Sequence, residues 1–433
     1  FQGTLSIIDV PAEKTLAAYS QAVYHNTPYH QQQESIADGE QGNPVPSKTG
    51  GTSPIKHVFY LIKENRTYDQ VLGDLPQGNG DKSLVLFGEK VTPNQHALAK
   101  QFVLLDNFYV DGEVSSDGHN WSMGAYATDF LEKNWPSHYG RRGGSEGSSG
   151  LRVVANNKDG FIWDNAKRSG VSFRTYGEFS NNNFQPQIPV LKDHLCPYFP
   201  SFNGNIRDTT RFRLFEREFD SLVAANALPQ LITIKFPNDH TEGTATGRPT
   251  PFAHVADNDL AVGMLIEHLS ESPIWKESVI FILEDDAQNG PDHVDAHRSP
   301  AYIAGGYIKR GYVDHTMYST SSVLRTIELI LGMPPMTQYD AAATPMWRCF
   351  AKEPEMKGFT ALPAQVNLNE KNKAENKLTT LSNKLDFSKE DMVPDQVMNE
   401  ILWKFVHGEN ASMPVPVRAA FLKERTEKEN EDD

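Results

Sequence analysis

The chain has 433 residues, and its 38% hydrophobic content is enough for a large core in one α/β unit or in two or three domains. Its formal charge of -15 argues against nucleic acid or an anionic membrane surface as the main partner. No apolar run reaches membrane-spanning length, and the two cysteines, Cys196 and Cys349, either pair in an oxidising compartment or stay as buried thiols.

The N-terminal part of the chain carries few signals of function. Phe1–Val10 (FQGTLSIIDV) begins near a glycine and is rich in β-branched residues, which predicts a strand. His30–Gly51 is a polar linker rich in Gly and Pro. The chain lacks an initiator Met and opens in what looks like the middle of a fold, so we expect that the true N-terminus is missing. We therefore place residues 1–50 outside the catalytic unit.

Strands and helices alternate from residue 55 to residue 332, which predicts an α/β unit, residues 51–335, with a mainly parallel central sheet flanked by helices. The expected strands are His57–Ile62, Val103–Val110, Val171–Tyr176, Leu231–Phe236, Val279–Leu283 and Tyr302–Ile308. The expected helices are Thr92–Phe102, Asp117–Leu131, Gly160–Arg168, Asp208–Ala227, Asn258–Leu269 and Ser319–Leu331. Asn181–Asn205, rich in Asn, Pro and aromatic residues, is expected to shape the substrate mouth.

The last part of the chain, residues 336–433, is rich in Pro and irregular. We expect one helix there, near Pro394–Val406, and an extension that packs on the core. The final residues, Lys423–Asp433, are strongly charged, which predicts a solvated acidic tail.

The strongest chemical signal follows the expected strand Val279–Leu283. This continuous apolar run predicts a strand buried on both faces, and it is followed by Asp285 and Asp286. Ligands of open α/β sheets bind beyond the carboxyl ends of strands, and adjacent carboxylates there repel each other unless a cation binds. His293 and His297 follow in the same loop, and carboxylate with imidazole suits zinc, manganese or iron. The alternative is a solvated acidic loop with incidental histidines.

Two other expected strands also end in polar groups. Glu64 and Asn65 follow the first strand of the catalytic unit, and Asp239 and His240 follow the strand at Leu231–Phe236. A carboxylate therefore stands where each of these expected strands stops, as it does after Val279–Leu283.

Serine hydroxyls stand where a further helix is expected to begin. Asp117 is expected as the N-cap, which would place Ser115 and Ser116 at the positive end of the helix. Each serine is either an ordinary cap or a nucleophile whose attack on phosphorus is assisted by the helix dipole and a metal. His119, one turn beyond Ser115, either donates a hydrogen bond to a phosphoryl oxygen or is a satisfied, partly buried side chain.

Further residues could contact the substrate. His297, Arg298 and His315 are candidates for phosphate contact, and Tyr176 with Glu178 closes a strand and could face the substrate. Each of these residues also has a purely structural interpretation.

The strand-end clusters, taken in chain order, resemble the phosphoesterase branch of the alkaline phosphatase superfamily, which holds bacterial phospholipases C and acid phosphatases. The most specific stretch is KENRTYDQVLGD, Lys63–Asp74. The resemblance implies an alkaline-phosphatase-like fold, metal binding by Glu64 and Asn65, and a Ser or Thr nucleophile at a helix start, for which Ser115 is favoured over Ser116. The short run GTLSIID near the N-terminus resembles a strand of a YVTN-type propeller, which implies a parent chain with an N-terminal β-propeller.

The loop after residue 284 also resembles that of phosphopentomutase and cofactor-independent phosphoglycerate mutase. This resemblance implies that Asp285 and Asp286 take the place of an Asp-His pair and that His293 binds a second metal. The superfamily completes that second site with Asp-x-x-x-His, whereas this chain has Asp239 followed at position 243 by Gly. Either the neighbouring His240 substitutes, or the second metal site is incomplete.

The resemblance implies a metal-dependent phosphoric ester hydrolase, a phosphatase or phosphodiesterase, that forms a phosphoseryl intermediate on a small phosphate ester. One or two divalent ions are expected, from among zinc, manganese, iron and calcium, and a secreted or periplasmic location. Two alternatives stay open. One is a sulfatase or phosphonate hydrolase of the same superfamily, although no Cys/Ser-x-Pro-x-Arg run surrounds Ser115. The other is a non-catalytic binding module on a hydrolase fold.

Overall fold

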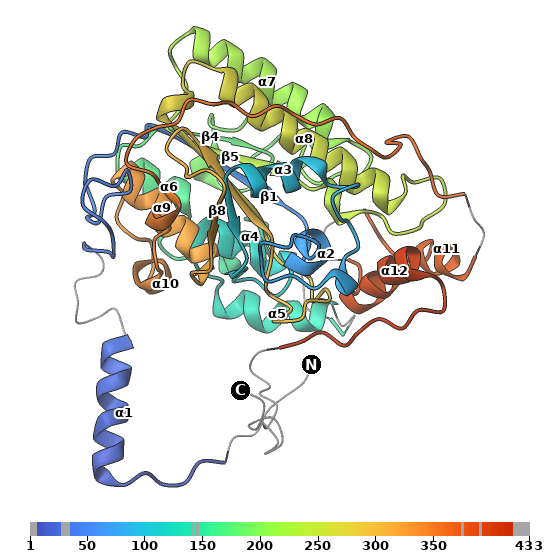
Figure 1. Ribbon diagram of the computed structural model, residues 1–433, viewed down its shortest axis with the longest axis horizontal. Helices are drawn as coiled ribbons and strands as arrows, with labels where there is room; N and C mark the ends of the chain where they lie inside the picture. The colour runs from blue at the N-terminus through green and yellow to red at the C-terminus, as the bar shows by residue number, and fades with distance from the viewer. Residues whose placement is uncertain are drawn as a thin grey trace.

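The structure is a computed structural model that describes residues 7–26, 35–139, 142–143, 147–373, 376–388 and 392–418. Most of the strand expected at Phe1–Val10, part of the linker His30–Gly51 and the whole acidic tail lie outside these residues. Residues 7–10 are described, and they are exposed and not in a strand. They precede helix α1, Glu13–Asn26, which the sequence did not predict and which stands apart from the body of the molecule (Figure 1).

A five-stranded sheet lies at the centre of the fold, with the order β4-β5-β1-β6-β7. Its strands are β1 His57–Lys63, β4 Phe173–Tyr176, β5 Leu231–Phe236, β6 Ser278–Glu284 and β7 Ala301–Gly305. The first four strands pair in parallel, and β7 runs antiparallel along β6 at the edge. The mainly parallel α/β sheet predicted from the sequence is confirmed.

Helices cover both faces of the sheet, because successive side chains of a strand point to opposite sides. Phe59 of β1 contacts Phe215 and Phe219 of α7, Asp208–Ala224, with ring centroids 6.4 and 6.1 Å apart. The next residue, Tyr60, donates a hydrogen bond to the backbone oxygen of Ser122 on α4, Ser115–Gly124. The sheet is therefore the middle layer of three, with α7 and α4 in opposite outer layers.

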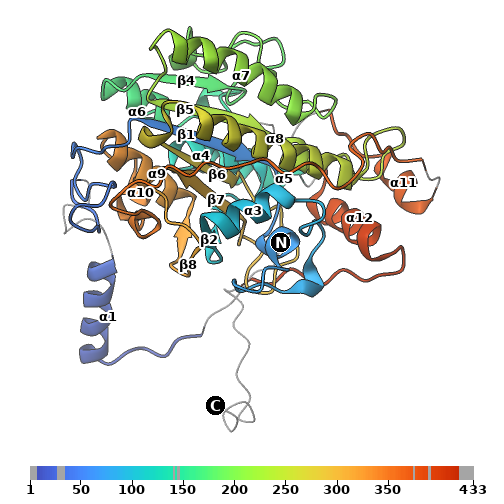
Figure 2. The ribbon, with the colours of Figure 1, turned by 45° about the horizontal axis from the view of Figure 1, so that its top comes forward.

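The remaining helices extend these two layers, as Figures 1 and 2 show. Helix α8, Pro251–Glu271, packs beside α7, and α3, Pro93–Gln101, packs beside α8, while α9, Thr320–Leu331, packs beside α4. The shorter or more peripheral helices are α2 Tyr68–Leu72, α5 Asp129–Tyr139, α6 Ile162–Arg168, α10 Gln338–Ala342, α11 Lys377–Ser382 and α12 Asp395–His407.

One expected strand is wrong. The run Val103–Val110 is two short strands, β2 Val103–Leu105 and β3 Phe108–Tyr109, which pair with β8 Tyr312–Asp314 and β9 Tyr318–Ser319 outside the central sheet. The polar residues between the two strands interrupt the apolar run, and the Asp106 side chain there accepts a hydrogen bond from the backbone N–H of Asn79. The apolar run therefore predicted strand conformation, but it did not predict with which strands these residues pair.

The C-terminal part of the chain is more ordered than its composition indicated. Helix α12 buries Met398, Leu402 and Trp403 in an apolar cluster with side chains that include Phe87 and Val255. The helix expected near Pro394–Val406 is confirmed, and the short helices α10 and α11 were not predicted.

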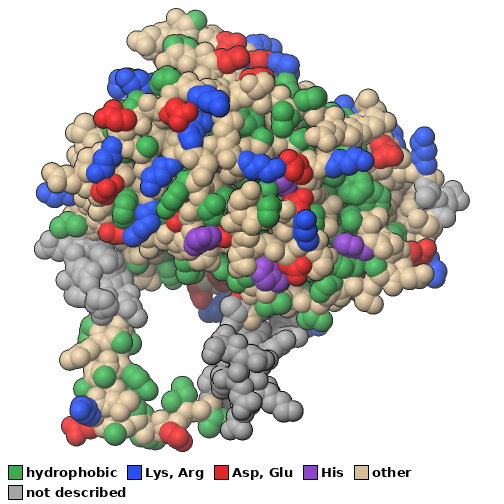
Figure 3. All heavy atoms as spheres, viewed as in Figure 1, with side chains coloured by type: hydrophobic (Ala, Val, Ile, Leu, Met, Phe, Trp, Pro, Cys, Tyr) green, Lys and Arg blue, Asp and Glu red, His purple; other side chains and the backbone are tan. Residues whose placement is uncertain are grey.

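Some properties expected from composition are also visible in the fold. Cys196 and Cys349 are both free and buried. Acidic and basic side chains are interspersed over the face drawn in Figure 3, so the negative charge of the chain does not gather there in one patch. Within the described ranges, every helix is too short or too polar to cross a bilayer.

Candidate active site

The carboxyl ends of β1, β5 and β6 bring the candidate residues together. Lys63, the last residue of β1, is in register with Phe236 at the end of β5 and with Glu284 at the end of β6. Glu64 and Asp285, which come directly after β1 and β6, therefore leave the sheet at the same edge, where both are fully buried.

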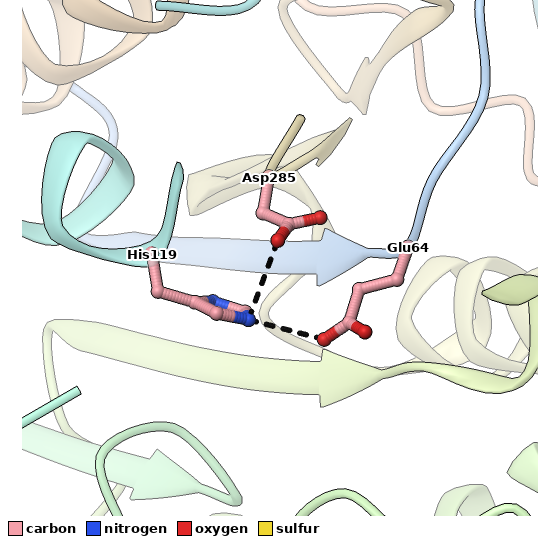
Figure 4. Close-up of side chains that lie close together, drawn as sticks. All are labelled: Glu64, His119 and Asp285. Atoms are coloured by element: carbon pink, nitrogen blue, oxygen red, sulfur yellow. Dashed lines mark hydrogen bonds and ion pairs between the residues drawn. The ribbon is translucent and has the colours of Figure 1, made fainter. Parts of the chain in front are cut away.

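Glu64, Asp285 and His119 form the centre of the site, and Figure 4 shows their side chains pointing toward one another. The Nε2 atom of His119 lies 3.0 Å from Glu64 Oε1 and 3.4 Å from Asp285 Oδ2. His119 reaches this point from α4. One ligand atom from each residue lies within 4.8 Å of the other two, a spacing that could accommodate a metal ion.

Two more charged side chains surround this group. The Lys235 ammonium, from β5, lies 2.9 Å from Glu64 Oε1 and 2.9 Å from His119 Nε2. Glu178, just after β4, places its Oε2 atom 3.4 Å from His119 Nδ1. Both side chains are almost completely buried, so the site combines several charges in a water-poor environment.

These neighbours set the protonation of the site. Burial raises the pKa of Glu64, but the Lys235 charge and the hydrogen bond from His119 outweigh it and lower that pKa to about 2. Burial and Lys235 lower the pKa of His119, but the charges of Glu178 and Asp285 outweigh them and raise it well above its ordinary value. These neighbours therefore favour the ionised form of Glu64 and the protonated form of His119.

The donor atoms fit a divalent ion. Among the described residues, Glu64 Oε2 and Asn65 Oδ1 are buried oxygens with no hydrogen-bond partner. Asp286 adds a second carboxylate beside Asp285, and burial together with the Asp285 charge raises its pKa well above the ordinary value. Buried oxygens without partners are costly, and a cation bound among them would remove that cost. Carboxylate and amide oxygens with one imidazole suit several divalent metals.

Ser115 lies beside these oxygens as the first residue of α4. Its Oγ atom accepts a hydrogen bond of 2.8 Å from Asn65 Nδ2 and donates one of 3.2 Å to Asp286 Oδ2. The helix N-terminus favours negative charge at this place. Ser116 is also buried and is the next residue of the helix, but it is Ser115 whose hydroxyl meets the metal-ligand candidates Asn65 and Asp286.

The expected N-cap of α4 is wrong. The helix begins at Ser115 with Val114 as N-cap, and Asp117 is its third residue. The carboxylate of Asp117 reaches back and accepts hydrogen bonds from the backbone N–H groups of Glu113, at 3.0 Å, and Val114, at 2.9 Å. Asp117 still stabilises the helix start, as the acidic partner of a capping box does.

Gly118 brings this helix start close to the Asp285 loop. A Cβ atom on Gly118 would lie 2.7 Å from the backbone oxygen of Asp285 and 2.9 Å from its carbonyl carbon. A Cβ on Gly112 would in turn lie 2.5 Å from the Cα of Gly118. Only glycine allows backbones to approach this closely, and the approach carries Ser115 to Asp286.

Asp239 and His240 have different partners from the other candidate metal ligands. Asp239 forms a 2.6 Å ion pair with Lys63, and the same ammonium lies 2.7 Å from Glu284. The other Asp239 oxygen accepts a hydrogen bond from the backbone N–H of Glu64 at 3.0 Å. His240 Nδ1 lies 2.9 Å from the backbone oxygen of Thr241. The Lys63 ammonium thus supplies the cation beside Asp239.

His293 belongs to a second group, with Asp69 and Asp292, rather than to the Asp285 centre. Its Nδ1 atom lies 2.6 Å from Asp69 Oδ2. Arg298 binds both carboxylates, with Nη2 3.0 Å from Asp69 Oδ1 and Nε 3.0 Å from Asp292 Oδ1. The buried Arg298 guanidinium thus pairs with both carboxylates of this group, whose three ligand atoms also lie close enough together to hold a metal ion.

The other substrate candidates lie in two places. His297 is held by Asp295, at 2.7 Å, and Glu113, at 3.1 Å, beside the start of α4. His315 is 70% exposed and lies 2.9 Å from Asp106. Tyr176 is buried and contacts Phe215 of α7, with ring centroids 5.0 Å apart. His297 is the member of this set that contacts Glu113, two residues before Ser115.

Sequence reasoning missed Lys235 completely and gave Glu178 little weight. A single lysine near the end of an apolar run reads as the solvated end of a strand, yet Lys235 is 3% exposed. Its position, one residue from the carboxyl end of a buried parallel strand, is the signal that could have identified it.

Comparison with known proteins identifies the family. The model of the Phosphoesterase family matches residues 77–334, more than half of the chain. The chain belongs to the Phosphoesterase family. It is therefore a hydrolase that acts on phosphate esters, and the resemblance seen in the sequence is confirmed. The matched residues of this phosphoesterase include Ser115, His119, Lys235 and Asp285, whereas Glu64 precedes them. A search of curated proteins finds no match.

Several solved structures are similar to this phosphoesterase. One is a protein in the alkaline phosphatase superfamily from Vibrio parahaemolyticus, with 16% identity and a TM-score of 0.49 over 74% of this chain and 77% of that chain. Another is the phosphonate monoester hydrolase of Agrobacterium radiobacter, with 12% identity and a TM-score of 0.42 over 65% of this chain and 74% of that one. A third is human ectonucleotide pyrophosphatase/phosphodiesterase 5, with 11% identity and a TM-score of 0.41 over 65% of this chain and 96% of that one.

Proposed function

We propose that this phosphoesterase is a metal-dependent hydrolase that transfers the phosphoryl group of a small phosphate ester to Ser115 and then to water. The observation that carries the proposal is the position of the Ser115 hydroxyl. It lies at a helix N-terminus, 2.8 Å from Asn65 and 3.2 Å from Asp286, within a group of buried oxygen ligands. A serine that only capped the helix would not need these partners.

Glu64, Asn65, Asp285 and Asp286 would hold the metal, and His119 lies beside them as a hydrogen-bond donor to Glu64. A divalent ion bound there acts as a Lewis acid that stabilises negative charge on phosphate oxygens and lowers the pKa of a nearby hydroxyl. Asp239 and His293 are not needed for this centre. Asp239 forms an ion pair with the Lys63 ammonium, and the Asp69 group that contains His293 forms one with the Arg298 guanidinium.

The reaction that these residues support has two steps. In the first, a bond forms between Ser115 Oγ and phosphorus, and the bond between phosphorus and the ester oxygen breaks. Asp286, which accepts the Ser115 hydrogen bond at 3.2 Å, is placed to take the hydroxyl proton. In the second, water attacks phosphorus, the bond to Ser115 Oγ breaks, and the serine is restored. The proton taken by Asp286 passes to the alcohol leaving group when the first step ends, and one proton of the attacking water passes to Ser115 Oγ in the second.

Lys235 and His119 supply positive charge for this chemistry. Both are buried, and their nitrogen atoms lie 2.9 Å apart. Preorganised charge in a site without water stabilises the oxygens of a transferring phosphoryl group strongly, because the groups need not reorient. We assign them to the non-bridging oxygens, which carry most of the negative charge in the transition state.

We also propose how the chain is divided into units. Residues 51–335 would form the catalytic unit, residues 336–433 an extension packed on it, and residues 1–50 a connection to a further unit such as a β-propeller. We also propose a secreted or periplasmic location, as the resemblance to bacterial phospholipases C and acid phosphatases implies.

The test combines metal removal with two serine variants. Chelator-treated protein should lose turnover of p-nitrophenyl phosphate and regain it with a divalent metal. Ser115→Ala should lose turnover by several orders of magnitude and keep its metal, because the removed oxygen makes the bond to phosphorus. Ser116→Ala, which changes the neighbouring hydroxyl, is the matched control and should stay active. Full activity of the chelated protein, or of Ser115→Ala, would contradict the proposal.

A further inference from the structure

The loop that carries the proposed metal ligands Asp285 and Asp286 continues through two residues in a left-handed conformation. Gln288 has a φ of 47° and Asn289 a φ of 55°. This conformation costs non-glycine residues about 1 kcal/mol or more each, so contacts elsewhere in the protein have to stabilise it. The space around the loop is also tight, because a Cβ on Gly290 would lie 2.7 Å from Gln70 Nε2.

The contacts that hold these two residues come from the C-terminal part of the chain. Asn399 of α12 is 3% exposed and donates a hydrogen bond of 2.7 Å to the backbone oxygen of Gln288. Asn289 donates one of 3.3 Å to Asp395, the first residue of α12, and accepts one from Arg418. More than a hundred residues separate the loop from each of these partners in the sequence.

The segment after α12 adds a second line of contact. It runs back along the lower edge of the molecule in Figure 1, beneath α5 and α2. Val417 accepts a hydrogen bond of 2.8 Å from the backbone N–H of Ala296, further along the same loop. The Arg418 guanidinium also lies 3.4 Å from Glu113, two residues before Ser115. The C-terminal part therefore contacts both the loop that carries the aspartates and the approach to the nucleophile.

Helix α12 is itself anchored firmly enough to act as a support. Met398, Leu402 and Trp403 are buried on one side of it, in a cluster that includes Phe87. Asn399 is the buried polar residue between these apolar anchors, and its amide points to the loop carbonyl. The helix thus gives the loop a rigid hydrogen-bond donor.

We propose that α12 and residues 408–418 form a brace that positions Asp285 and Asp286 for metal binding, with Asn399 as its main positioning residue. The inference rests on the proposed metal-dependent function. Asn399 touches neither substrate nor metal ligand and acts through Gln288. Groups that orient metal ligands in this indirect way typically change metal affinity about 10- to 100-fold when they are altered.

The experiment compares two buried asparagines with the same local geometry. Asn399 and Asn165 each donate one hydrogen bond of 2.7 Å from a helix to a backbone oxygen, that of Gln288 and that of Pro334. Asn165 is 1% exposed and lies on α6, at the other end of the molecule from α12 in Figures 1 and 2. Asn399→Asp and Asn165→Asp therefore make the same change in similar surroundings, one beside the loop and one remote from it.

Each full-length variant is treated with chelator, titrated with Mn²⁺ by calorimetry, and assayed for thermal unfolding and for turnover of p-nitrophenyl phosphate. Both variants should lower the unfolding temperature, because both place a carboxylate against a carbonyl oxygen. Asn399→Asp alone should weaken Mn²⁺ binding about 10-fold or more, and excess Mn²⁺ should restore part of its turnover. Asn399→Ala and Asn165→Ala repeat the comparison without a new charge, in case an aspartate variant does not fold.

The outcomes separate the two proposals. Mn²⁺ affinity of the Asn399 variants equal to that of the wild type, or weakened equally in the Asn165 variants, would overturn the brace and leave the metal-dependent mechanism intact. A wild-type protein that binds no divalent ion and still hydrolyses the ester would overturn the mechanism and the brace together.

Discussion

Replacing Gly118 by alanine tests whether the close approach of α4 to the Asp285 loop places the nucleophile. The new Cβ would lie 2.7 Å from the Asp285 backbone oxygen, whereas ordinary contacts begin at 3.4 Å. The neighbouring atoms are backbone, so a side chain cannot rotate to make room. Helix α4 would have to move away from the loop by about 0.7 Å, the difference between these two distances.

A movement of this size would disrupt the serine contacts. The hydrogen bonds of Ser115 to Asn65 and Asp286, now 2.8 and 3.2 Å long, would lengthen toward the limit of hydrogen bonding. A misplacement of about 1 Å at a reacting group lowers the rate about 100-fold. Overpacking costs about 1–3 kcal/mol, while alanine gains about 0.5–1 kcal/mol over glycine within a helix. We therefore expect a large loss of turnover with a stability loss of about 2 kcal/mol or less.

The assay measures turnover of p-nitrophenyl phosphate and thermal unfolding for Gly118→Ala. Ser122→Ala is the control on the same helix, since the Ser122 hydroxyl is buried without a hydrogen-bond partner among the described residues. That control should keep both turnover and stability. Wild-type turnover in Gly118→Ala would show that the contact with the Asp285 loop does not place Ser115.

Two further predictions concern the residues expected from the sequence to contact substrate. Arg298→Met should lower the unfolding free energy by about 3–5 kcal/mol, because it leaves the buried carboxylate of Asp69 without its cation; an unchanged stability with a raised KM would instead place Arg298 at the substrate. Burial lowers the pKa of His297, but hydrogen bonds to Asp295 and Glu113 outweigh it and raise that pKa to about 9. The resulting stabilisation is complete below the ordinary pKa of 6.5 and is lost as pH rises through about 9, so unfolding temperature should fall over this window in the wild type and be flatter in His297→Gln.

The sequence predicted the parts of the site that follow from strand ends. Buried apolar runs that stop at Glu64 and Asp285 showed where the sheet would present carboxylates, and parallel pairing brought them to one edge. Ser115 was recognisable because a hydroxyl at a helix start is chemically special. These inferences needed only local patterns and the direction of the strands.

The partners of buried charges could not be predicted in this way. Nothing local in the sequence shows that Lys63 pairs with Asp239, or that Arg298 pairs with the Asp69 group that contains His293, a group whose spacing could also hold a metal ion. Lys235 was missed for the same reason: its role depends on Glu64 and His119, which come from other elements. Charge pairing between distant segments is decided by tertiary packing.

Long-range pairing also explains the errors in the fold. The run at Val103–Val110 is apolar enough to be a central strand, but its two halves pair with β8 and β9, more than two hundred residues later. The contribution of α12 was invisible for a similar reason, since Asn399 matters only through its contact with Gln288. Composition marked this part of the chain as irregular and gave no indication of a role at the site.

The most direct test of the proposed mechanism is to identify the residue that carries phosphorus during turnover. The enzyme is mixed with a ³²P-labelled phosphate ester, quenched in acid within the first turnovers, and digested for mass spectrometry. The mechanism predicts label on Ser115 of the wild type and of Ser116→Ala, and none on Ser115→Ala. Label on Ser116, or an active enzyme that never carries covalent phosphorus, would contradict it.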